Sequence, residues 1–170
     1  VVRNPFRVPY DAACSWPGED KGYRFACIAA GEPQRKGQDL LLRILAQEEW
    51  RKRDITVDFI SQGGCSLQAL KDTARYLQLS SVRFSGKVSD IRNLWEQYHG
   101  LILPSRREGV PLVLVEAMLC GRICIVTDVG GNAEIIKDGN TGFIASSASV
   151  AALARAMERA WEKRSLWEDI

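Results

Sequence analysis

The stretch from Leu101 to Phe143 constrains the fold of this chain more than any other part of the sequence. It holds two short apolar runs, Leu101–Leu103 and Ile123–Val126, and between them a helical pattern that we predict to begin at Pro111. Proline suits the first helical position because its missing N–H would have no partner there, and Gly121 suits the position where a helix ends. Two buried strands joined by a helix form the repeating unit of a parallel sheet.

The same alternation continues upstream of this stretch. We expect strands at Tyr23–Ala29, Ile55–Ile60 and Val82–Phe84, each followed by a helix. Thr56 and Asp58 alternate with apolar residues, so one face of the second strand is expected to be less buried. Five strands alternating with helices predict one α/β domain, a Rossmann-like parallel sheet in a three-layer α/β/α arrangement. Loops that follow parallel strands gather at one edge of such a sheet, where ligands bind.

Helix caps, the C-terminal residues and the tryptophans give further predictions about the fold. Ser89 and Ser149 are suited to be the N-caps of the helices that follow them. The last residues, WEKRSLWEDI, are expected to begin a helix that crosses to another domain. The tryptophans expected in the core or at a domain interface are Trp95, Trp161 and Trp167.

Glu116 is the residue that the predicted fold explains least. Its neighbours one helical turn away are all apolar, namely Leu112, Val113, Leu119 and Cys120. A helix that is apolar all round is expected to be buried, and a buried, unpaired carboxylate is costly. Either a group of the protein satisfies Glu116, or the carboxylate faces a cleft and accepts hydrogen bonds from a ligand's hydroxyls. The start of the same helix offers free N–H groups and the positive end of the helix dipole, which suit an anion.

Two motifs in this order resemble those of a known family. Glu108 and Glu116, with seven residues between them, lie in PSRREGVPLVLVEAMLCGR, and TDVGGNAEIIKDGNTGF follows. This arrangement resembles the E-x7-E signature of the retaining GT-B glycosyltransferases of glycosyltransferase family 4, also called group 1. Lys36 and Gly37, in RKGQDLL, resemble the K-G-x-D-L motif of the same family. The resemblance extends from about Phe25 to Trp161.

The resemblance implies a fold and an activity. The chain would be the C-terminal half of a GT-B fold, with residues 23–170 as the donor-binding domain, residues 1–22 as a linker, and an acceptor-binding N-terminal domain outside the chain. The implied reaction is a hexosyltransferase-like transfer of sugar from a nucleotide-diphosphate sugar to an acceptor, with retention and with no metal or other cofactor. The acceptor, a sugar, a lipid or another small molecule, would be bound by the missing domain, so this chain alone would transfer nothing.

The resemblance also implies which residues form the site. Lys36 would stabilise the charge of the departing diphosphate. Glu108 would contact the donor sugar and stabilise an oxocarbenium-like transition state, and Glu116 would accept the ribose hydroxyls. The further donor-binding residues that it implies are Gly31, Gly63, Gly64, Lys87, Val88, Gly109, Val110, Pro111 and Leu112. The turn Gly130-Gly131-Asn132 with Glu134 resembles the family's G-G-x-x-E.

The chain departs from the family pattern at one place. The family usually has an Arg in a G-R or A-R pair where this chain has Ala30 and Gly31, and Arg35 and Arg106 are the candidates to replace it. Another interpretation of Glu108 is also open, since the segment from Ser105 fits a capping box, S-x-x-E.

Three other functional classes are compatible with the same residues. A GT-B sugar epimerase or phosphorylase would share the architecture. A non-catalytic protein that binds nucleotide sugars would share the pocket, and the missing arginine keeps that class open. In the third, the domain binds no ligand and its carboxylates are structural.

Composition narrows the choice of partners. A net charge of +2 gives no basic stripe for nucleic acid, and no apolar run is long enough to span a membrane. Peripheral association of a longer protein with a membrane stays compatible. The chain begins Val1-Val2 without Met or a signal peptide, which suggests a piece of a longer protein.

Cysteine usage indicates the redox compartment. The five cysteines form no C-x-x-C pair and His99 is the one histidine, so no metal site is expected. Reduced core cysteines favour a cytoplasmic location. His99, next to a buried strand, is expected to be a hydrogen-bonded boundary residue.

Overall fold

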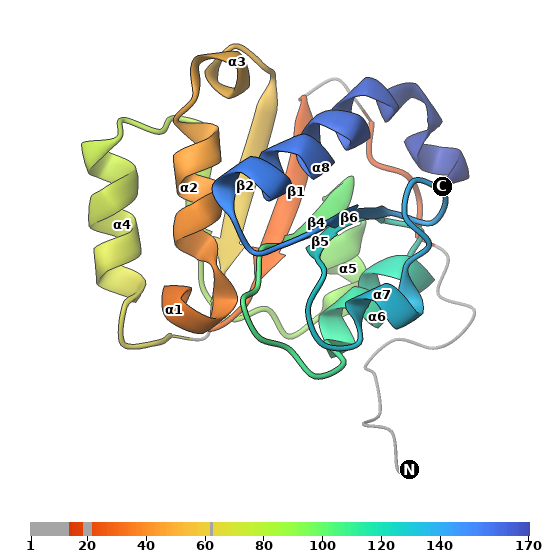
Figure 1. Cartoon of the computed structure of the whole chain (residues 1–170), viewed down its shortest axis with the longest axis horizontal. Helices are drawn as coiled ribbons and strands as arrows, with labels where there is room; N and C mark the ends of the chain where they lie inside the picture. The colour runs from red at the N-terminus through yellow and green to blue at the C-terminus, as the bar shows by residue number, and fades with distance from the viewer. Residues whose placement is uncertain (1–13, 19–21, 62) are drawn as a thin grey trace.

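The computed structural model describes residues 14–18, 22–61 and 63–170. Its centre is a sheet of six parallel strands in the order β3-β2-β1-β4-β5-β6 (Figure 1). The strands are β1 (Tyr23–Ile28), β2 (Ile55–Ile60), β3 (Val82–Ser85), β4 (Gly100–Leu103), β5 (Ile123–Thr127) and β6 (Phe143–Ala145). The chain adds strands outward from β1 in one direction and then returns to add β4 on its other side. The switch in strand order therefore lies between β1 and β4.

Helices cover both faces of the sheet, which confirms the predicted three-layer α/β/α fold. They are α1 (Pro33–Lys36), α2 (Gln38–Leu45), α3 (Glu48–Arg51), α4 (Leu67–Tyr76), α5 (Ile91–Trp95), α6 (Leu112–Leu119), α7 (Asn132–Ile135), α8 (Val150–Glu162) and the 3-10 helix η2 (Arg164–Asp169). Side chains of α2, α3, α4, α8 and η2 share one apolar cluster, and those of α5 and α6 share the other. The two clusters lie on opposite faces because neighbouring residues of a strand point to opposite sides.

Both faces of each central strand are buried, so apolar residues run continuously instead of alternating with polar ones. Phe25 belongs to one cluster and Ala26 to the other. The expectation of a less buried face on β2 holds for Thr56, which is half-buried, and not for Asp58 on the same face, because helices cover both faces of the sheet there. Asp58 is only 4% exposed, and its carboxylate accepts hydrogen bonds from Ser85 Oγ at 2.8 Å and Tyr98 OH at 2.9 Å. Burial and the bond to Asp58 raise the pKa of Tyr98.

The structure corrects three predicted boundaries. A sixth strand, β6, pairs with β5 where none was expected. Helix α6 begins at Leu112, and Pro111 has extended backbone angles, so the proline is the N-cap and not the first helical residue. Helix α5 is capped by the Asp90 carboxylate, which accepts from the Asn93 N–H, and not by Ser89. The other predicted caps are confirmed: Ser149 caps α8, and Gly121 follows α6 with a φ of 68°.

The C-terminal segment packs on its own domain through Trp167. Trp167 in η2 is 2% exposed and donates its Nε1–H to the carbonyl of Ala160 at 2.8 Å. Its ring contacts Tyr23 and Phe25 edge to face. The tryptophan is therefore a core residue.

The N-terminal segment is described only in part. Residues 1–13 and 19–21 of the predicted linker lie outside the described residues. Within residues 14–18, the carbonyl of Ser15 accepts a hydrogen bond from Arg122, whose guanidinium lies over the Trp16 ring. Trp16 also contacts the ring of His99. His99 is buried, and so does not lie at a boundary as expected. The Nδ1 atom of His99 accepts a hydrogen bond from the Arg24 N–H at 3.0 Å.

Among the described helices, none is long and apolar enough to cross a membrane. Across residues 14–18, 22–61 and 63–170, no three His, Cys, Asp or Glu side chains gather in a way that could hold a metal ion. The five cysteines are free of disulfides, and burial raises the pKa of the Cys27 thiol to about 12.

Candidate functional site

The loops after β1 and β4 meet at the switch in strand order. Lys36 Nζ, from the first loop, lies 2.7 Å from Oε1 and 2.9 Å from Oε2 of Glu108, from the second. The two side chains are 16% and 9% exposed. Crevices at such switch points are the usual ligand sites of parallel sheets. The structure thus places the two residues with predicted catalytic roles at the expected edge and in direct contact.

Gly37 allows the two loops to approach. It ends α1 with a φ of 67°, a conformation that favours glycine. A Cβ at this position would lie 1.8 Å from the carbonyl oxygen of Pro104. The glycine that follows Lys36 is therefore needed both for its backbone angles and for close packing against the β4 loop.

Glu108 is also held from within its own loop. The buried Ser105 donates its Oγ–H to Glu108 Oε1 at 2.7 Å. This contact joins two side chains, whereas a capping box would join each side chain to backbone N–H groups at a helix start. Since α6 begins four residues later, at Leu112, the capping-box interpretation of this segment is wrong.

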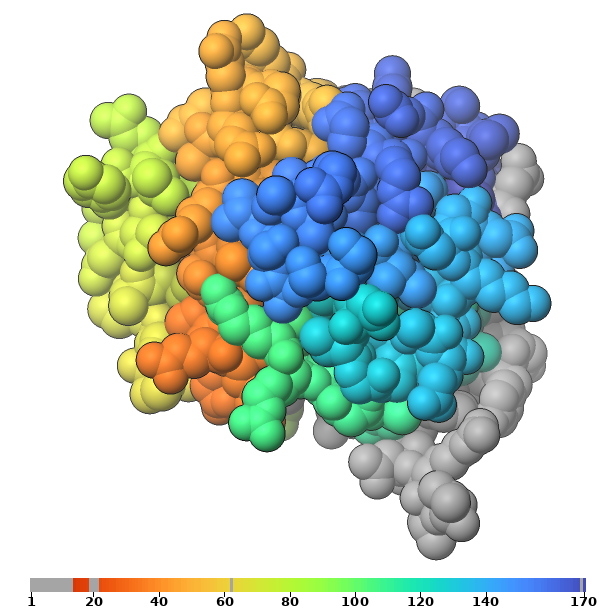
Figure 2. Space-filling model, in the orientation of Figure 1, coloured from red at the N-terminus to blue at the C-terminus, as the bar shows by residue number. Residues whose placement is uncertain are grey.

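The loop after β5 supports the loop after β4. The Gly131 N–H donates to the carbonyl of Gly109 at 2.8 Å. A Cβ on Gly130, whose φ is 56°, would lie 2.3 Å from the carbonyl oxygen of Glu108. The double glycine therefore serves a close backbone approach, and Glu134, beyond it on α7, is exposed. Figure 2 shows the atoms of the loops after β1, β4 and β5 (orange, green and teal) side by side along the lower part of this face.

Both arginines considered as replacements for the family's missing arginine are engaged in ion pairs. Arg106 contacts both carboxylate oxygens of Asp39, at 2.6 and 2.8 Å. Burial raises the pKa of Asp39, but the hydrogen bond and charge of Arg106 outweigh it and hold this pKa below its usual value. Arg35 pairs with Glu32 at 3.0 Å in an exposed position.

The predicted glycines of the β1 and β2 loops contact each other. The Gly31 N–H donates to the carbonyl of Gly63 at 2.8 Å. A Cβ on Gly64 would lie 2.5 Å from the Gly31 nitrogen. These glycines allow the loops after β1 and β2 to pack tightly at the edge where the predicted site lies, so they have a structural function there.

Glu116 lies in a second part of the same edge, a pocket of about 230 Å³ on the α5 and α6 face. The residue is 6% exposed. The pocket is lined by Ile28, Ile60, Lys87, Val88, Ile91, Leu94, Leu112, Val113 and Glu116. These residues come from the ends of β1 and β2, the loop after β3, and two helices. Four of the predicted donor-binding residues, Lys87, Val88, Leu112 and Glu116, are therefore brought together.

The remaining predicted residues lie in the connecting loop. Gly109 is exposed, with open space where a Cβ would be, and Val110 is 58% exposed. Pro111 is buried at the start of α6. Sequence reasoning missed the function of Ser105 as the partner of Glu108, although its S-x-x-E spacing was visible, and it missed the Asp39–Arg106 pair, for which the sequence holds no local signal.

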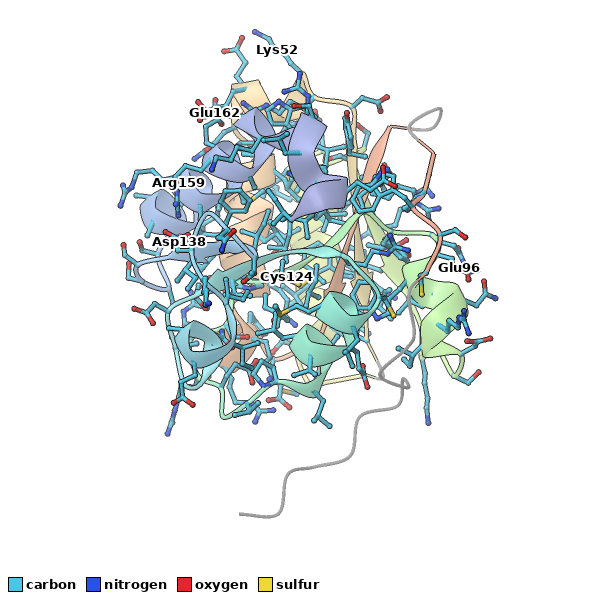
Figure 3. The ribbon with its side chains drawn as sticks, turned by 90° about the vertical axis from the view of Figure 1, so that its right-hand side faces the viewer. Lys52, Glu96, Cys124, Asp138, Arg159 and Glu162 are labelled. Atoms are coloured by element: carbon cyan, nitrogen blue, oxygen red, sulfur yellow. The ribbon has the colours of Figure 1, made fainter. Side chains whose placement is uncertain are left out.

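Two larger hollows lie at the outer edges of the sheet. One, of about 590 Å³, lies between α4 and β3 and includes Phe84 and Arg75. The other, of about 490 Å³, lies beside β6 and α8, and its lining includes Asp138 and Arg159, which form an ion pair and are labelled in Figure 3. Size alone would favour them, but both are remote from the switch in strand order. We therefore assign the candidate site to the smaller pocket and the adjoining Lys36–Glu108 pair.

A doubly wound parallel sheet whose strand order switches beside the Lys36–Glu108 pair has the architecture in which ligands bind outside the carboxyl ends of the strands. Residues 22–163 match the family model described as glycosyl transferases group 1. This match covers most of the chain, and the chain belongs to that family.

Two relatives illustrate the similarity. N-acetyl-alpha-D-glucosaminyl L-malate synthase of Bacillus anthracis is 43% identical over 63 residues, 37% of this chain and 16% of that protein. An uncharacterized glycosyltransferase of Methanocaldococcus jannaschii is 29% identical over 126 residues, 72% of this chain and 34% of that protein. The chain spans about a third or less of the length of these relatives.

Solved structures support the fold. The lipopolysaccharide outer core galactosyltransferase WaaB, in its apo form, has a TM-score of 0.82 at 23% identity, covering 99% of this chain and 49% of that one. Anabaena HepE in complex with UDP has a TM-score of 0.77 at 24% identity, covering 87% and 41%. These likenesses confirm the GT-B type of α/β domain that was predicted.

Proposed function

We propose that this chain is the donor-binding half of a retaining GT-B glycosyltransferase of family 4. In this proposal the intact protein transfers a hexose-type sugar from a nucleoside diphosphate sugar to an acceptor held by a second, N-terminal domain. The observation that carries it is the Lys36–Glu108 pair across the switch point, adjoining the pocket lined by Glu116. The complex of the structural neighbour HepE with UDP supports a nucleotide donor.

The polar part of the site would act on the diphosphate and the sugar. As the bond from the anomeric carbon to the diphosphate oxygen breaks, its electron pair goes to the diphosphate. A bond forms from the same carbon to the acceptor hydroxyl, whose proton passes to the departing oxygen. Lys36 and the N-terminus of α6 would stabilise the growing negative charge, so we expect no metal requirement. Glu108 would bind the sugar hydroxyls and face the developing positive charge.

The apolar part of the site would hold the nucleoside. Glu116 would accept the ribose hydroxyls, which a carboxylate does in a partly enclosed position. Aliphatic residues such as Ile28 and Ile60 would cover the base, and the exposed Lys87 with Val88 would border it. The loops after β1 and β2 would line part of the donor site with Gly31, Gly63 and Gly64.

The domain division belongs to the same proposal. Residues 23–170 would form the donor domain and residues 1–22 the linker, and a sugar, lipid or other small-molecule acceptor would bind outside this chain. The chain covers 49% of WaaB, which leaves room there for a second domain of similar size. The chain alone would bind the donor weakly and transfer nothing.

A second candidate is a protein that binds nucleotide sugars without catalysis. It is favoured by Ala30 and Gly31, which stand where the family has an arginine, and by the ion pairs that engage Arg35 and Arg106. A site with one cation fewer would stabilise the leaving group less. Product analysis of the intact protein separates transfer, epimerisation, phosphorolysis and binding alone.

The experiment that tests the proposal is a titration of this chain with UDP, GDP and ADP, followed by calorimetry and NMR. We expect one nucleotide to bind with a Kd in the micromolar to millimolar range and to shift resonances of Val88, Leu112 and Glu116. Shifts confined to the hollow beside Phe84, or none at millimolar nucleotide, would contradict the site.

A further inference from the structure

Ser105 holds one oxygen of the Glu108 carboxylate. Its Oγ–H donates to Oε1 at 2.7 Å, and Ser105 itself is fully buried. The same oxygen accepts from Lys36 Nζ at 2.7 Å, and Oε2 accepts from Lys36 at 2.9 Å. Of these three hydrogen bonds, two come from the lysine and one from the serine.

Two more buried side chains fix Ser105 in turn. Thr127 Oγ1, at the end of β5, donates to the carbonyl of Ser105. Asn132 Nδ2, at the start of α7, donates to the carbonyl of Thr127 at 2.9 Å. All three residues are 0% exposed. Buried hydrogen bonds of this kind restrict the backbone and side chains that they join to one arrangement.

Lys36 has a different relation to the carboxylate. It lies 72 residues away in the chain, and it is the cation that a diphosphate would attract. If the diphosphate takes the lysine, Glu108 loses both hydrogen bonds from Nζ. The bond from Ser105 is the described contact that remains, and Oε2 is then available to a sugar hydroxyl.

We propose that Ser105 is a positioning residue that keeps Glu108 oriented toward the donor sugar when Lys36 turns from Glu108 to the diphosphate. Thr127 and Asn132 extend this support from the loop after β5. The inference rests on the proposed function, since it needs a sugar at Glu108. A glutamate held by a fixed hydrogen bond loses less side-chain conformational freedom when the sugar binds. The same bond keeps the carboxylate close to the position in which it contacts the sugar.

A purely structural function for Ser105 leads to a different expectation. A residue that only tethered the loop would, when changed, lower stability and weaken binding of nucleotide and nucleotide sugar alike. A positioning residue instead affects the sugar-dependent part of binding and turnover. The ratio of the Kd of a nucleotide sugar to the Kd of the free nucleotide separates these cases.

The experiment compares Ser105→Ala with Glu108→Gln in this chain. The Kd of UDP is compared with those of UDP-glucose, UDP-galactose and UDP-N-acetylglucosamine, and the Kd of GDP with that of GDP-mannose. We use the nucleotide sugar that binds wild type most tightly. For both variants we expect the ratio of the nucleotide sugar's Kd to the free nucleotide's Kd to rise about fivefold or more. The Kd of the free nucleotide should change less than twofold for Ser105→Ala. For Glu108→Gln it should not rise, because the diphosphate no longer competes with a charged Glu108 for Lys36.

Further variants guard against a change in folding. Ser105→Cys keeps the shape of the side chain with a slightly larger atom and donates a weaker hydrogen bond, so it should resemble Ser105→Ala. Thr127→Val removes the hydroxyl at nearly constant shape and should raise the ratio less. Ser85→Ala is the control for losing a serine–carboxylate hydrogen bond elsewhere, because the exposed Ser85 donates to the carboxylate of Asp58 at 2.8 Å.

Each outcome decides between the alternatives. A raised ratio for Glu108→Gln together with an unchanged ratio for Ser105→Ala and Ser105→Cys overturns this inference and leaves the proposed function standing. Equal weakening of nucleotide and nucleotide sugar by Ser105→Cys shows a structural tether and also overturns it. If wild type binds none of these compounds, the proposed function fails and this inference fails with it.

Discussion

Glu108 and Glu116 belong to one loop and helix, with seven residues between them, but their surroundings differ. Glu108 accepts three hydrogen bonds, from Lys36 and Ser105, at the ends of β1 and β4. Glu116 lines a pocket whose other walls are mostly aliphatic. One carboxylate is thus part of a polar network and the other is set in an apolar wall.

The difference shows how one segment can serve two parts of a ligand. An anionic group of the ligand can replace Glu108 as the partner of Lys36. The lysine is already largely removed from water in this pair, so its desolvation cost does not have to be met again when the ligand binds. The aliphatic pocket gives shape and burial, and its carboxylate adds selectivity for hydroxyl groups. If the Lys36–Glu108 network and the Glu116 pocket serve different parts of the ligand, substitutions in the two regions should have different effects.

Removing either charge at the switch point should have the largest effect. We expect Lys36→Ala and Glu108→Gln in the intact protein to lower turnover about 100-fold, roughly 2.7 kcal/mol of transition-state stabilisation. Sugar transfer is measured at saturating donor. Lys52→Ala is the control, since Lys52 is 71% exposed and pairs with Glu48 on the surface. A loss below tenfold in both site variants would show that the network has no catalytic part.

Replacing Gly37 should separate the two loops. We expect Gly37→Ala to lower the free energy of unfolding by at least about 2 kcal/mol, because its positive φ disfavours alanine and the new Cβ meets the Pro104 carbonyl. Gly121→Ala is the matched control: its φ of 68° is similar, but nothing lies within 4 Å of its Cβ. It should lose about 1 kcal/mol. Urea unfolding gives both values, and equal losses would contradict the close approach of the loops.

Glu116→Gln should weaken nucleotide binding and leave the ion pair intact. We expect the Kd of UDP, or of the nucleotide that binds best, to rise about tenfold, roughly 1.4 kcal/mol. Calorimetry measures this change, with Glu49→Gln on the exposed side of α3 as the control. Glu108→Gln should not raise the same Kd, because it leaves Lys36 without a competing carboxylate charge. If the two glutamate variants weaken UDP equally, the two regions are not separate.

The smallest effect concerns pH and the Asp39–Arg106 pair beside the site. Because the pKa of Asp39 is held below its ordinary value, the carboxylate stabilises the fold above about pH 4, and this contribution is lost as the pH falls through the folded pKa. Asp39→Asn should therefore cost up to about 1 kcal/mol at pH 7 and less at pH 2.5. Urea unfolding at both pH values measures it.

A second ion pair provides the comparison for this prediction. Asp138 also has a lowered pKa: burial raises it, but the hydrogen bonds from Arg159 and from the Ile144 N–H outweigh that effect. Asp138→Asn should show the same pH dependence of stability without changing the Kd of UDP. A cost for either variant that stays constant from pH 7 to pH 2.5 would contradict the assignment.

Local sequence was enough for most of the fold. The apolar runs at β4 and β5 identified buried parallel strands, and Gly121 and Ser149 identified helix ends, because these signals depend on a few neighbouring residues. Ser89 and Pro111 were misplaced by one position, since a cap is decided by backbone angles that several neighbouring residues can satisfy. The three-residue strand β6 was missed because its pairing with β5, and not its own length, makes it a strand.

The site was predictable in its residue types and not in its contacts. The sequence by itself determined a parallel α/β domain of the group 1 glycosyl transferases, with Lys36, Glu108 and Glu116 after or near strand ends. Only the tertiary structure decided that the strand order reverses between β1 and β4, and that Lys36 and Ser105 meet on one carboxylate. The physical reason is distance along the chain: a contact between residues 36 and 108 depends on how the whole sheet is assembled, which no short stretch of sequence encodes.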